Sequence, residues 1–345
     1  MNGSVVHTIR SASVEAFADL GELPADAASL FPAAQDDLFA SSAWYRTVLG
    51  HAMPESSVAS FVLCRIDGRP AALFPMQVSA RDRALTSLTT PYTCVYHPLV
   101  AARLDTTALE QAFAAFARFC RSCPLIRIDA LPADWYGLET CIGAIGAANL
   151  TARRFNHFGN WHEPIDGRTW EQYLTGRPGQ LRETIRRKLR RSERDPDHRF
   201  EVVTGGDGLA TGIETFEAVY RRSWKETEPF PDFNAALMRE LAPLGLLRLG
   251  ILYNGADAIA VQLWVAERHR ATVLKLAHDE AFKPASPGTV LTALLASAPA
   301  LDEKRLDQIA ALPLGGRIKV DPWTDQVELQ VQGRATDFGA RENGI

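Results

Sequence analysis

The sequence predicts an α/β protein built from mixed, mostly antiparallel sheets that are flanked by helices. Two apolar runs pair around Asp67-Gly68 in the first half of the chain, and two more pair around Asn254-Gly255 in the second. Such dipeptides between strand-like runs are typical of tight hairpin turns. In each half an apolar helical stretch comes next and leads to a short strand that carries an aspartate. This repeated order predicts that one fold occurs twice along the chain.

The repeat places a boundary near residue 160. We expect a first unit over residues 1–159, a second unit over 160–335 and a flexible tail over 336–345. A length of 345 residues fits two domains of ordinary size.

Composition excludes several classes of protein. Hydrophobic residues make up 46% and charged residues 23%, which are the proportions of a folded globular chain. A net charge of -4 argues against a generally basic nucleic-acid binder. No stretch has the length and apolarity of a signal peptide or a membrane span, so we expect a cytoplasmic protein that does not contact a membrane.

Cysteine and histidine usage predicts no metal site. The five cysteines are an odd number without framework spacing, so we expect free thiols in a reducing compartment. Cys120 and Cys123 form a lone C-x-x-C, which is more typical of two buried thiols than of a redox or zinc site. The eight histidines are scattered, and none forms a ligand-spaced pair with a nearby cysteine or acid.

In the first unit, apolar periodicity gives the expected elements in order. These are a helix at 36–50, hairpin strands at 58–66 and 69–78, a helix at 106–120, a strand at 125–131 and a helix at 133–150.

The second unit begins with a helix pair and a strand within 169–205 and continues through a longer series of elements. We expect helices at 208–226 and 234–245, strands at 246–253, 258–267 and 271–279, a helix at 288–301, and strands at 306–312 and 326–333. The helix at 288–301 should form a right-handed crossover. That connection would place the strands before and after it parallel and adjacent.

The stretch "FKPASPGTVL" at 282–291 joins a strand to this crossover helix. The first N–H groups of a helix are unpaired and carry the positive end of its dipole, so a small-residue loop there favours a phosphate. Ser286, Gly288 and Thr289 are residue types that suit such a site, and Lys283 adds a cation. The alternative is an ordinary cap, with Ser286 as N-cap and Pro287 at the first helical position.

Five stretches in order resemble the GNAT N-acyltransferases, and more narrowly the CelD/BioF2-like acetyltransferases, which are distant relatives of the FemAB transferases. The stretches are "LRETIRRKLRRSER", "VYRRSWKE", "LLRLGILYNGADAIAVQLWV", "LKLAHDEAFKPASPGTVL" and "LDQIAALPLGGRIKVDPW". Asp307, Gly316, Lys319 and Trp323 fit the family pattern, whereas Ile318 stands where tyrosine is usual. The resemblance implies tandem GNAT-like domains, with a degenerate domain at 1–159 and an acyl-CoA site in the second.

The resemblance also implies a reaction in which an amine attacks the acyl thioester directly. The oxyanion donor would be a backbone N–H at about Leu274, Lys275 or Leu276, in the strand before the phosphate loop. Candidates for the base are His278, Asp279 and Asp307. Many GNAT enzymes use a late tyrosine as thiol acid, but this chain has none after Tyr253, which leaves water or Lys319.

Two further groups are candidates for binding. The helix at 182–194 carries seven Arg or Lys residues, and Arg187 and Arg191 could grip the phosphates of CoA. An acyl carrier protein or a tRNA is an alternative partner for this helix, and a solvated helix paired with acids is the simpler interpretation. Trp224 is a candidate for a substrate contact, with core packing as the alternative. Tyr92, Tyr96 and His97 are further candidates, and an irregular packed loop would explain these three residues equally well.

The function expected is transfer of an acyl group, acetyl foremost, from acyl-CoA to an amine of a small molecule or sugar. A FemAB-like enzyme that uses aminoacyl-tRNA or acyl carrier protein is the alternative. An inactive binding protein of a polysaccharide pathway is a third hypothesis, and the missing late tyrosine favours it. The sequence leaves the acceptor and the oligomeric state open.

Overall fold

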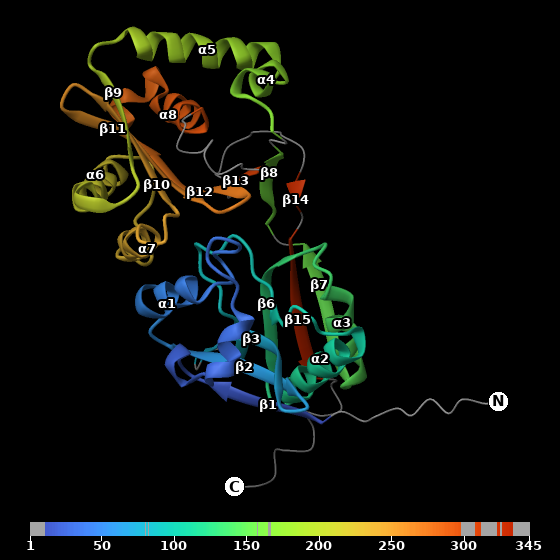
Figure 1. Ribbon diagram of the computed structural model, residues 1–345. Coiled ribbons are helices and arrows are strands. Elements are labelled where there is room, and N and C mark those ends of the chain that lie inside the picture. Colours follow the sequence, from blue (N-terminus) through green and yellow to red (C-terminus); the bar gives the residue numbers. More distant parts are fainter. Residues whose placement is uncertain are drawn as a thin grey trace.

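The computed structural model describes residues 11–79, 81, 83–156, 158–164, 167–297, 308–311, 323–324 and 326–333. Two twisted sheets form two bodies that lie one above the other in Figure 1. The α/β fold with mixed, mostly antiparallel sheets and flanking helices is therefore as the sequence predicts.

The first body contains most of the first half of the chain. Its elements are β1 (Ala12–Phe17), the short helices η1 (Leu20–Glu22) and η2 (Ala25–Leu30), α1 (Ser42–His51), β2 (Ser57–Ile66), β3 (Arg69–Ser79), β4 (Ala84–Ser87), β5 (Leu99–Val100), α2 (Thr106–Cys120), β6 (Leu125–Pro132), α3 (Leu138–Ala147) and β7 (Leu150–Asn156). The predicted hairpin is confirmed, since β2 and β3 pair antiparallel. Its turn residues Asp67 and Gly68 have φ of 50° and 76°, the left-handed region that such turns require.

The second body contains most of the rest. Its elements are β8 (Asn160–Pro164), α4 (Trp170–Thr175), α5 (Gly179–Arg194), β9 (His198–Val203), η3 (Gly206–Gly208), α6 (Leu209–Arg221), α7 (Phe233–Leu241), β10 (Leu247–Asn254), β11 (Asp257–Ala266), β12 (Arg270–His278), η4 (Glu280–Ala285), α8 (Pro287–Ala296), β13 (Gln308–Ala311) and β14 (Trp323–Thr324). The predicted parallel pairing around the crossover helix is confirmed, because β12 and β13 are parallel neighbours. Helix α6 ends at Arg221, earlier than expected, so Trp224 and Lys225 lie in the segment before α7.

The two sheets have the same topology. The first runs β1-β2-β3-β4-β6-β15-β7 with β5 on the side of β3, and the second runs β9-β10-β11-β12-β13-β8-β14. Each has one parallel pair at the same place, β4 with β6 and β12 with β13, and antiparallel pairs elsewhere along the path. This match supports the predicted repeat of one fold.

The last strand, β15 (Gln326–Gly333), differs from the expectation. The sequence analysis assigned it to the second unit, but it pairs with β6 and β7 in the first sheet (Figure 1). In return β8 lies between β13 and β14 in the second sheet. Each sheet thus has, next to its edge strand, a strand from the other half of the chain. Alternating apolar residues in 326–333 indicate a strand with one buried face, but they do not say which sheet buries it.

A continuous apolar core joins the two bodies. It includes Trp44 of α1 and Phe233 of α7, whose rings meet edge to face with centroids 5.6 Å apart. Tyr92 stacks on Phe233 at 4.3 Å. A second cluster lies under α2 and α3, and a third lies under α8. The second sheet is therefore covered on one face by α6 and α7 and on the other by α8, with α5 packed on α8.

The structure places all five cysteines and shows the length and apolarity of the described helices. All five cysteines are free, and Cys120 is buried as expected while Cys123 is half-buried. None of the described helices is both long and apolar enough to cross a membrane. Within the described residues, no group of three or more His, Cys, Asp or Glu side chains is placed to hold a metal ion.

Candidate functional site

Strand β12 contains a β-bulge at the point where the oxyanion donor is expected. It pairs with β13 over Arg270 to Val273, and within the described residues this pairing goes no further. On its other side, Leu263 of β11 pairs with Lys275 and Trp264 pairs with Val273, so Leu274 is the extra residue of a β-bulge. Beyond Val273, therefore, β12 has one edge that no described strand covers. Leu274 itself is buried in the core between the bodies.

The first turn of α8 follows β12 and η4 in the chain. Ser286 has φ of 58° and its side chain makes no capping hydrogen bond, which argues against the simple N-cap interpretation. Pro287 occupies the first helical position. The amides of Thr289 and Val290 both donate to the Ser286 carbonyl oxygen, at 3.1 and 3.2 Å. The Gly288 N–H has no acceptor among the described residues. Fewer amides are therefore free for an anion than the sequence suggested.

Buried polar groups fix the position of α8. The amide nitrogen of Gln262 on β11 donates to the Gly288 carbonyl oxygen at 3.1 Å, and Trp264 Nε1 donates to Gln262 Oε1 at 2.7 Å. Gln262 is fully buried, so these bonds act in a low dielectric. Gly250 on β10 lets the helix approach, because a Cβ there would lie 2.6 Å from Leu295. The first turn of α8 is thus held rigidly against the sheet.

Two lysines lie near this turn, and one of them was missed by the sequence analysis. Lys188 of α5 donates to the carbonyl oxygens of Pro284 and Ala285, both at 3.2 Å. Its ammonium therefore adds positive charge directly before the helix. The predicted Lys283 is exposed and pairs with Glu280 at 3.0 Å. Nothing in the sequence connects Lys188 with a loop almost a hundred residues later.

His278 and Asp279, the two predicted bases at the end of β12, have different surroundings. The His278 ring lies against the Trp224 ring, with centroids 4.4 Å apart, and next to Gly288. Burial lowers the pKa of His278 below its ordinary value of 6.5, despite the opposing charge of Glu280. At neutral pH the imidazole is therefore uncharged and able to accept a proton.

Asp279 is already occupied by protein groups. It accepts from the Ala281 amide at 2.9 Å and binds Arg222 at 2.7 Å. Burial alone would raise its pKa, but these hydrogen bonds hold the pKa of Asp279 below its ordinary value. Asp279 is thus the N-cap of η4 and the ion-pair partner of Arg222.

A cluster of titratable side chains lies on the other face of β12, where the two bodies meet. Glu228 accepts hydrogen bonds from Lys275 at 2.6 Å and from Tyr220. The Lys275 ammonium also lies 4.5 Å from the centre of the Tyr92 ring. Burial raises the pKa of Glu228, but the bonds from Lys275 and Tyr220 outweigh it and keep the pKa low. Sequence analysis named Tyr92 and Lys275 separately, and it missed Tyr220 and Glu228.

The other predicted substrate residues differ in exposure. Trp224 is 45% exposed, so core packing does not explain it. Tyr96 is 2% exposed in the core of the first body, with its hydroxyl 3.5 Å from Met76 Sδ. This burial contradicts a substrate contact for Tyr96, because the packed loop encloses its ring. His97 binds Asp37 at 3.0 Å, and Asp37 raises the pKa of His97 although burial lowers it.

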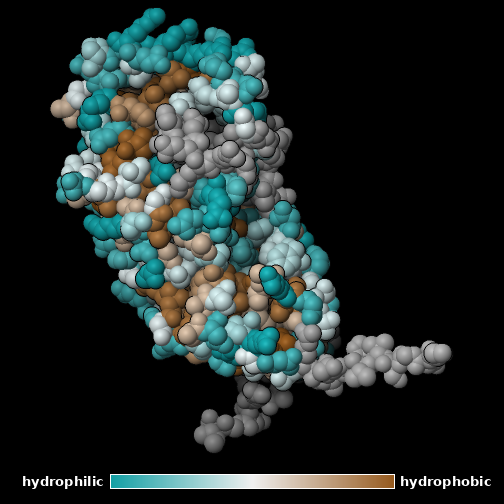
Figure 2. Space-filling view, viewed as in Figure 1, coloured by the Kyte–Doolittle hydropathy of each residue, from teal (hydrophilic) through white to brown (hydrophobic). Residues whose placement is uncertain are grey.

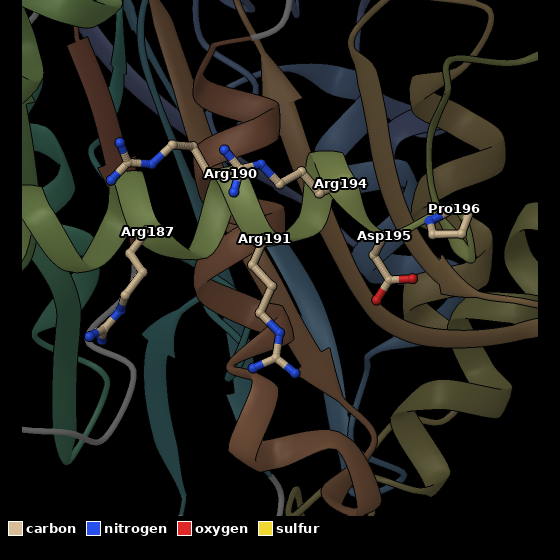
Figure 3. A pocket seen from close by; sticks show the side chains of 6 residues that line it. All are labelled: Arg187, Arg190, Arg191, Arg194, Asp195 and Pro196. Carbon is tan, nitrogen blue, oxygen red and sulfur yellow. The ribbon is translucent and has the colours of Figure 1, made fainter.

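Helix α5 carries the predicted basic surface. Arg187, Arg190, Arg191 and Arg194, here called the arginine face, line an open hollow of about 710 Å³ together with Asp195 and Pro196. Figure 3 shows Arg187 and Arg191 extending to one side of the helix and the other two arginines to the opposite side. In Figure 2 the same end of the molecule is a hydrophilic band. Among the described residues, none of the four arginines has a carboxylate within 4.0 Å. Arg182 and Arg186, by contrast, pair with Glu183 and Glu171.

Some of the remaining predicted site residues lie in the described part of the chain, and others do not. Leu276 and Thr289 lie on β12 and α8 with half-buried and exposed side chains, respectively. Asp307 and Lys319 lie outside the described residues.

One protein family matches part of the chain. Residues 179–306 match the family described as "Acetyltransferase (GNAT) domain". No curated protein matches the chain.

Solved structures show the same fold at low identity. FemX matches with a TM-score of 0.56 and 11% identity, over 88% of this chain and 94% of that one. A tandem GNAT protein from the clavulanic acid biosynthesis pathway, solved without AcCoA, matches with a TM-score of 0.51 and 12% identity, over 93% and 98%. A conserved protein of unknown function from Bacteroides thetaiotaomicron matches with a TM-score of 0.50 and 12% identity, over 84% and 89%. The fold is thus that of tandem GNAT-like proteins.

Proposed function

We propose that this protein is an N-acyltransferase that moves an acyl group, acetyl foremost, from acyl-CoA to an amine of a small molecule or sugar. One observation carries the proposal. Next to His278 at the end of β12, the first turn of α8 has a Gly288 amide without an acceptor among the described residues, and the Lys188 ammonium lies nearby. A CelD/BioF2-like subfamily, a cytoplasmic location and a donor-binding role for residues 160–335 belong to the same proposal.

In the proposed complex the CoA diphosphate lies at the start of α8, because the helix dipole and Lys188 both favour negative charge there. The thioester then lies along β12, close to the Leu274 bulge. A backbone N–H near the Leu274 bulge donates to the carbonyl oxygen as negative charge develops on it.

The reaction forms one C–N bond and breaks one C–S bond. The ammonium of the acceptor first loses a proton to His278, whose imidazole is uncharged at neutral pH. The free amine attacks the carbonyl carbon, and the tetrahedral intermediate loses its second nitrogen proton to water as it expels the CoA thiolate. The thiolate takes a proton from water or from Lys319, so the products are an amide and the CoA thiol.

Calorimetric titration with acetyl-CoA tests the proposal at Gly288. A Cβ at this position would lie 3.6 Å from His278 Nδ1, an ordinary contact, so Gly288→Ala is a matched control that adds volume without charge. Gly288→Asp places a carboxylate where the diphosphate binds, and we expect at least a hundredfold loss of affinity. Equal affinity of the two variants would remove this loop from the donor site. Release of CoA thiol with an amine panel then separates an active enzyme from an inactive binding protein.

A second candidate function uses a larger donor, an aminoacyl-tRNA or an acyl carrier protein. The arginine face favours it, because four exposed guanidinium groups without carboxylate partners suit a polyanion. The simpler alternative is that cations in the last turn of α5 stabilise its dipole. If a carrier is the donor, changing both Arg187 and Arg191 to glutamate should abolish transfer from the carrier-bound donor. The rate of transfer from acetyl-CoA should then stay within about threefold of the wild-type rate. Loss of acetyl-CoA binding alone would assign these arginines to the nucleotide.

A further inference from the structure

Lys225 is a charged side chain without a carboxylate partner among the residues that the structure describes. It lies in the segment between α6 and α7, and its side chain is half-buried. Among the described residues, its ammonium has neither a hydrogen-bond acceptor nor a carboxylate within ion-pair distance. A partly buried, unpaired ammonium is unfavourable, so such a group is expected to acquire an anion or to serve a reaction.

The surroundings of Lys225 make its charged form less favourable. Its ammonium lies 5.3 Å from the centre of the Trp224 ring, which accounts for some stabilisation. Lys275, however, is close enough to repel it, and the nearby Glu228 is already bonded to Lys275 and Tyr220. Burial first, and then the charge of Lys275, lower the pKa of Lys225. Glu228 therefore pairs with Lys275 alone, and the cluster of the two lysines and this carboxylate keeps an excess positive charge.

The position of Lys225 connects this excess charge with the proposed reaction. Trp224 contacts His278 at the end of β12, and Lys275 is the first residue after the Leu274 bulge. Tyr92 reaches the same place from the first body through its contact with Lys275. A small molecule bound at Lys225 would thus lie between the two bodies, beside the strand edge where the thioester is expected, with the Trp224 ring as an apolar wall.

We propose that Lys225 binds an anionic group, a carboxylate or a phosphate monoester, of the amine acceptor. This inference rests on the proposed function and names the class of acceptor: an amino acid or a phosphorylated amine rather than a plain amine. The ammonium of Lys225 holds one end of the acceptor. The amine at the other end then faces β12, and Tyr92 gives the first body a part in acceptor binding.

Matched acceptor pairs test the proposal in the full-length protein. L-lysine with cadaverine, L-ornithine with putrescine, and glycine with methylamine differ by a carboxylate, whereas phosphoethanolamine and ethanolamine differ by a phosphate. We expect the anionic member of at least one pair to have a kcat/KM at least tenfold higher. Lys225→Met should remove that preference through KM, and Lys225→Arg should retain most of it. An equal preference in wild type and Lys225→Met would overturn the proposal.

A readout without turnover keeps the result independent of the proposed function. Reductive methylation followed by mass spectrometry reports the reactivity of Lys225, with the exposed Lys283 as internal reference. Hexanoate or inorganic phosphate, but not hexanamide, should slow methylation of Lys225 relative to Lys283. Absence of protection by both anions would contradict an anion site. Protection at Lys225 in a protein that binds no acetyl-CoA would refute the transferase and leave the anion site in place.

Discussion

Helices α2 and α8 occupy the same place in the two sheets, yet their first turns are built differently. Each connects two parallel neighbouring strands, β4 with β6 and β12 with β13. At α2 the Asp105 carboxylate accepts from the Ala108 amide at 2.8 Å, so the protein itself supplies negative charge to the helix start. At α8 the Ser286 side chain makes no such bond, and Lys188 lies nearby instead.

This difference teaches which copy of the fold is suited to hold an anionic cofactor. A carboxylate at the start of α2 both occupies an amide and repels a phosphate. The start of α8 is electrostatically open. We therefore propose that the second body binds the donor, while the first body contributes packing and Tyr92 to the opposite side of the site.

The largest expected effect is a loss of stability when a buried side chain of β15 is shortened. Leu329 of β15 is fully buried in the first body although it lies near the end of the chain. Leu329→Ala should lower the free energy of unfolding by about 2–5 kcal/mol, because it leaves a cavity between β6 and β7. Urea unfolding measures the change, and the half-buried Glu328→Ala is the control on the same strand. If both variants unfold alike, β15 is not part of the first core.

The next effect distinguishes His278 from Asp279. His278→Gln should lower kcat about a hundredfold and leave acetyl-CoA affinity unchanged. Because the pKa of His278 is below 6.5, the base is active at neutral pH, and the wild-type rate should fall as pH drops through that pKa. This acid limb of the pH–rate profile should be absent in His278→Gln and retained in Asp279→Asn. An acid limb that vanishes in the aspartate variant instead would reverse the assignment.

The smallest expected effect is a loss of stability at the start of α2. Asp105→Ala should lower the free energy of unfolding by about 1 kcal/mol through loss of the α2 cap. Acetyl-CoA affinity should stay the same, because the first body is not proposed to bind the donor. Thermal unfolding and calorimetry measure both quantities. A tighter complex in this variant would mean that the start of α2 competes for the same ligand.

Local signals made much of the fold predictable. Asp67-Gly68 forms the first hairpin turn, where both residues have left-handed backbone. The second hairpin is also as predicted, but its turn is Gly255-Ala256, one residue later than Asn254-Gly255, because Asn254 still pairs with Asp257. The crossover helix at 288–301 implied the parallel neighbours β12 and β13, which the structure confirms. The end of α6 at Arg221 was not predicted, because the apolar pattern continues beyond it.

The site was less predictable, since its contacts join distant parts of the chain. Glu228 and Lys275 lie 47 residues apart, and Lys188 reaches Ala285 across 97 residues. Tyr96 has the composition of a substrate contact, but only tertiary packing shows that it is buried. Likewise, the alternation of Val327, Leu329 and Val331 predicts a buried face without naming the sheet that covers it.

Amide hydrogen exchange with and without acetyl-CoA tests the central claim most directly, since it compares the two helix starts in one unaltered protein. Bound acetyl-CoA should slow exchange in residues 279–290, around the start of α8, and leave residues 101–109, around the start of α2, unchanged. Protection at 101–109, or unchanged exchange at 279–290 while acetyl-CoA is bound, would contradict the account.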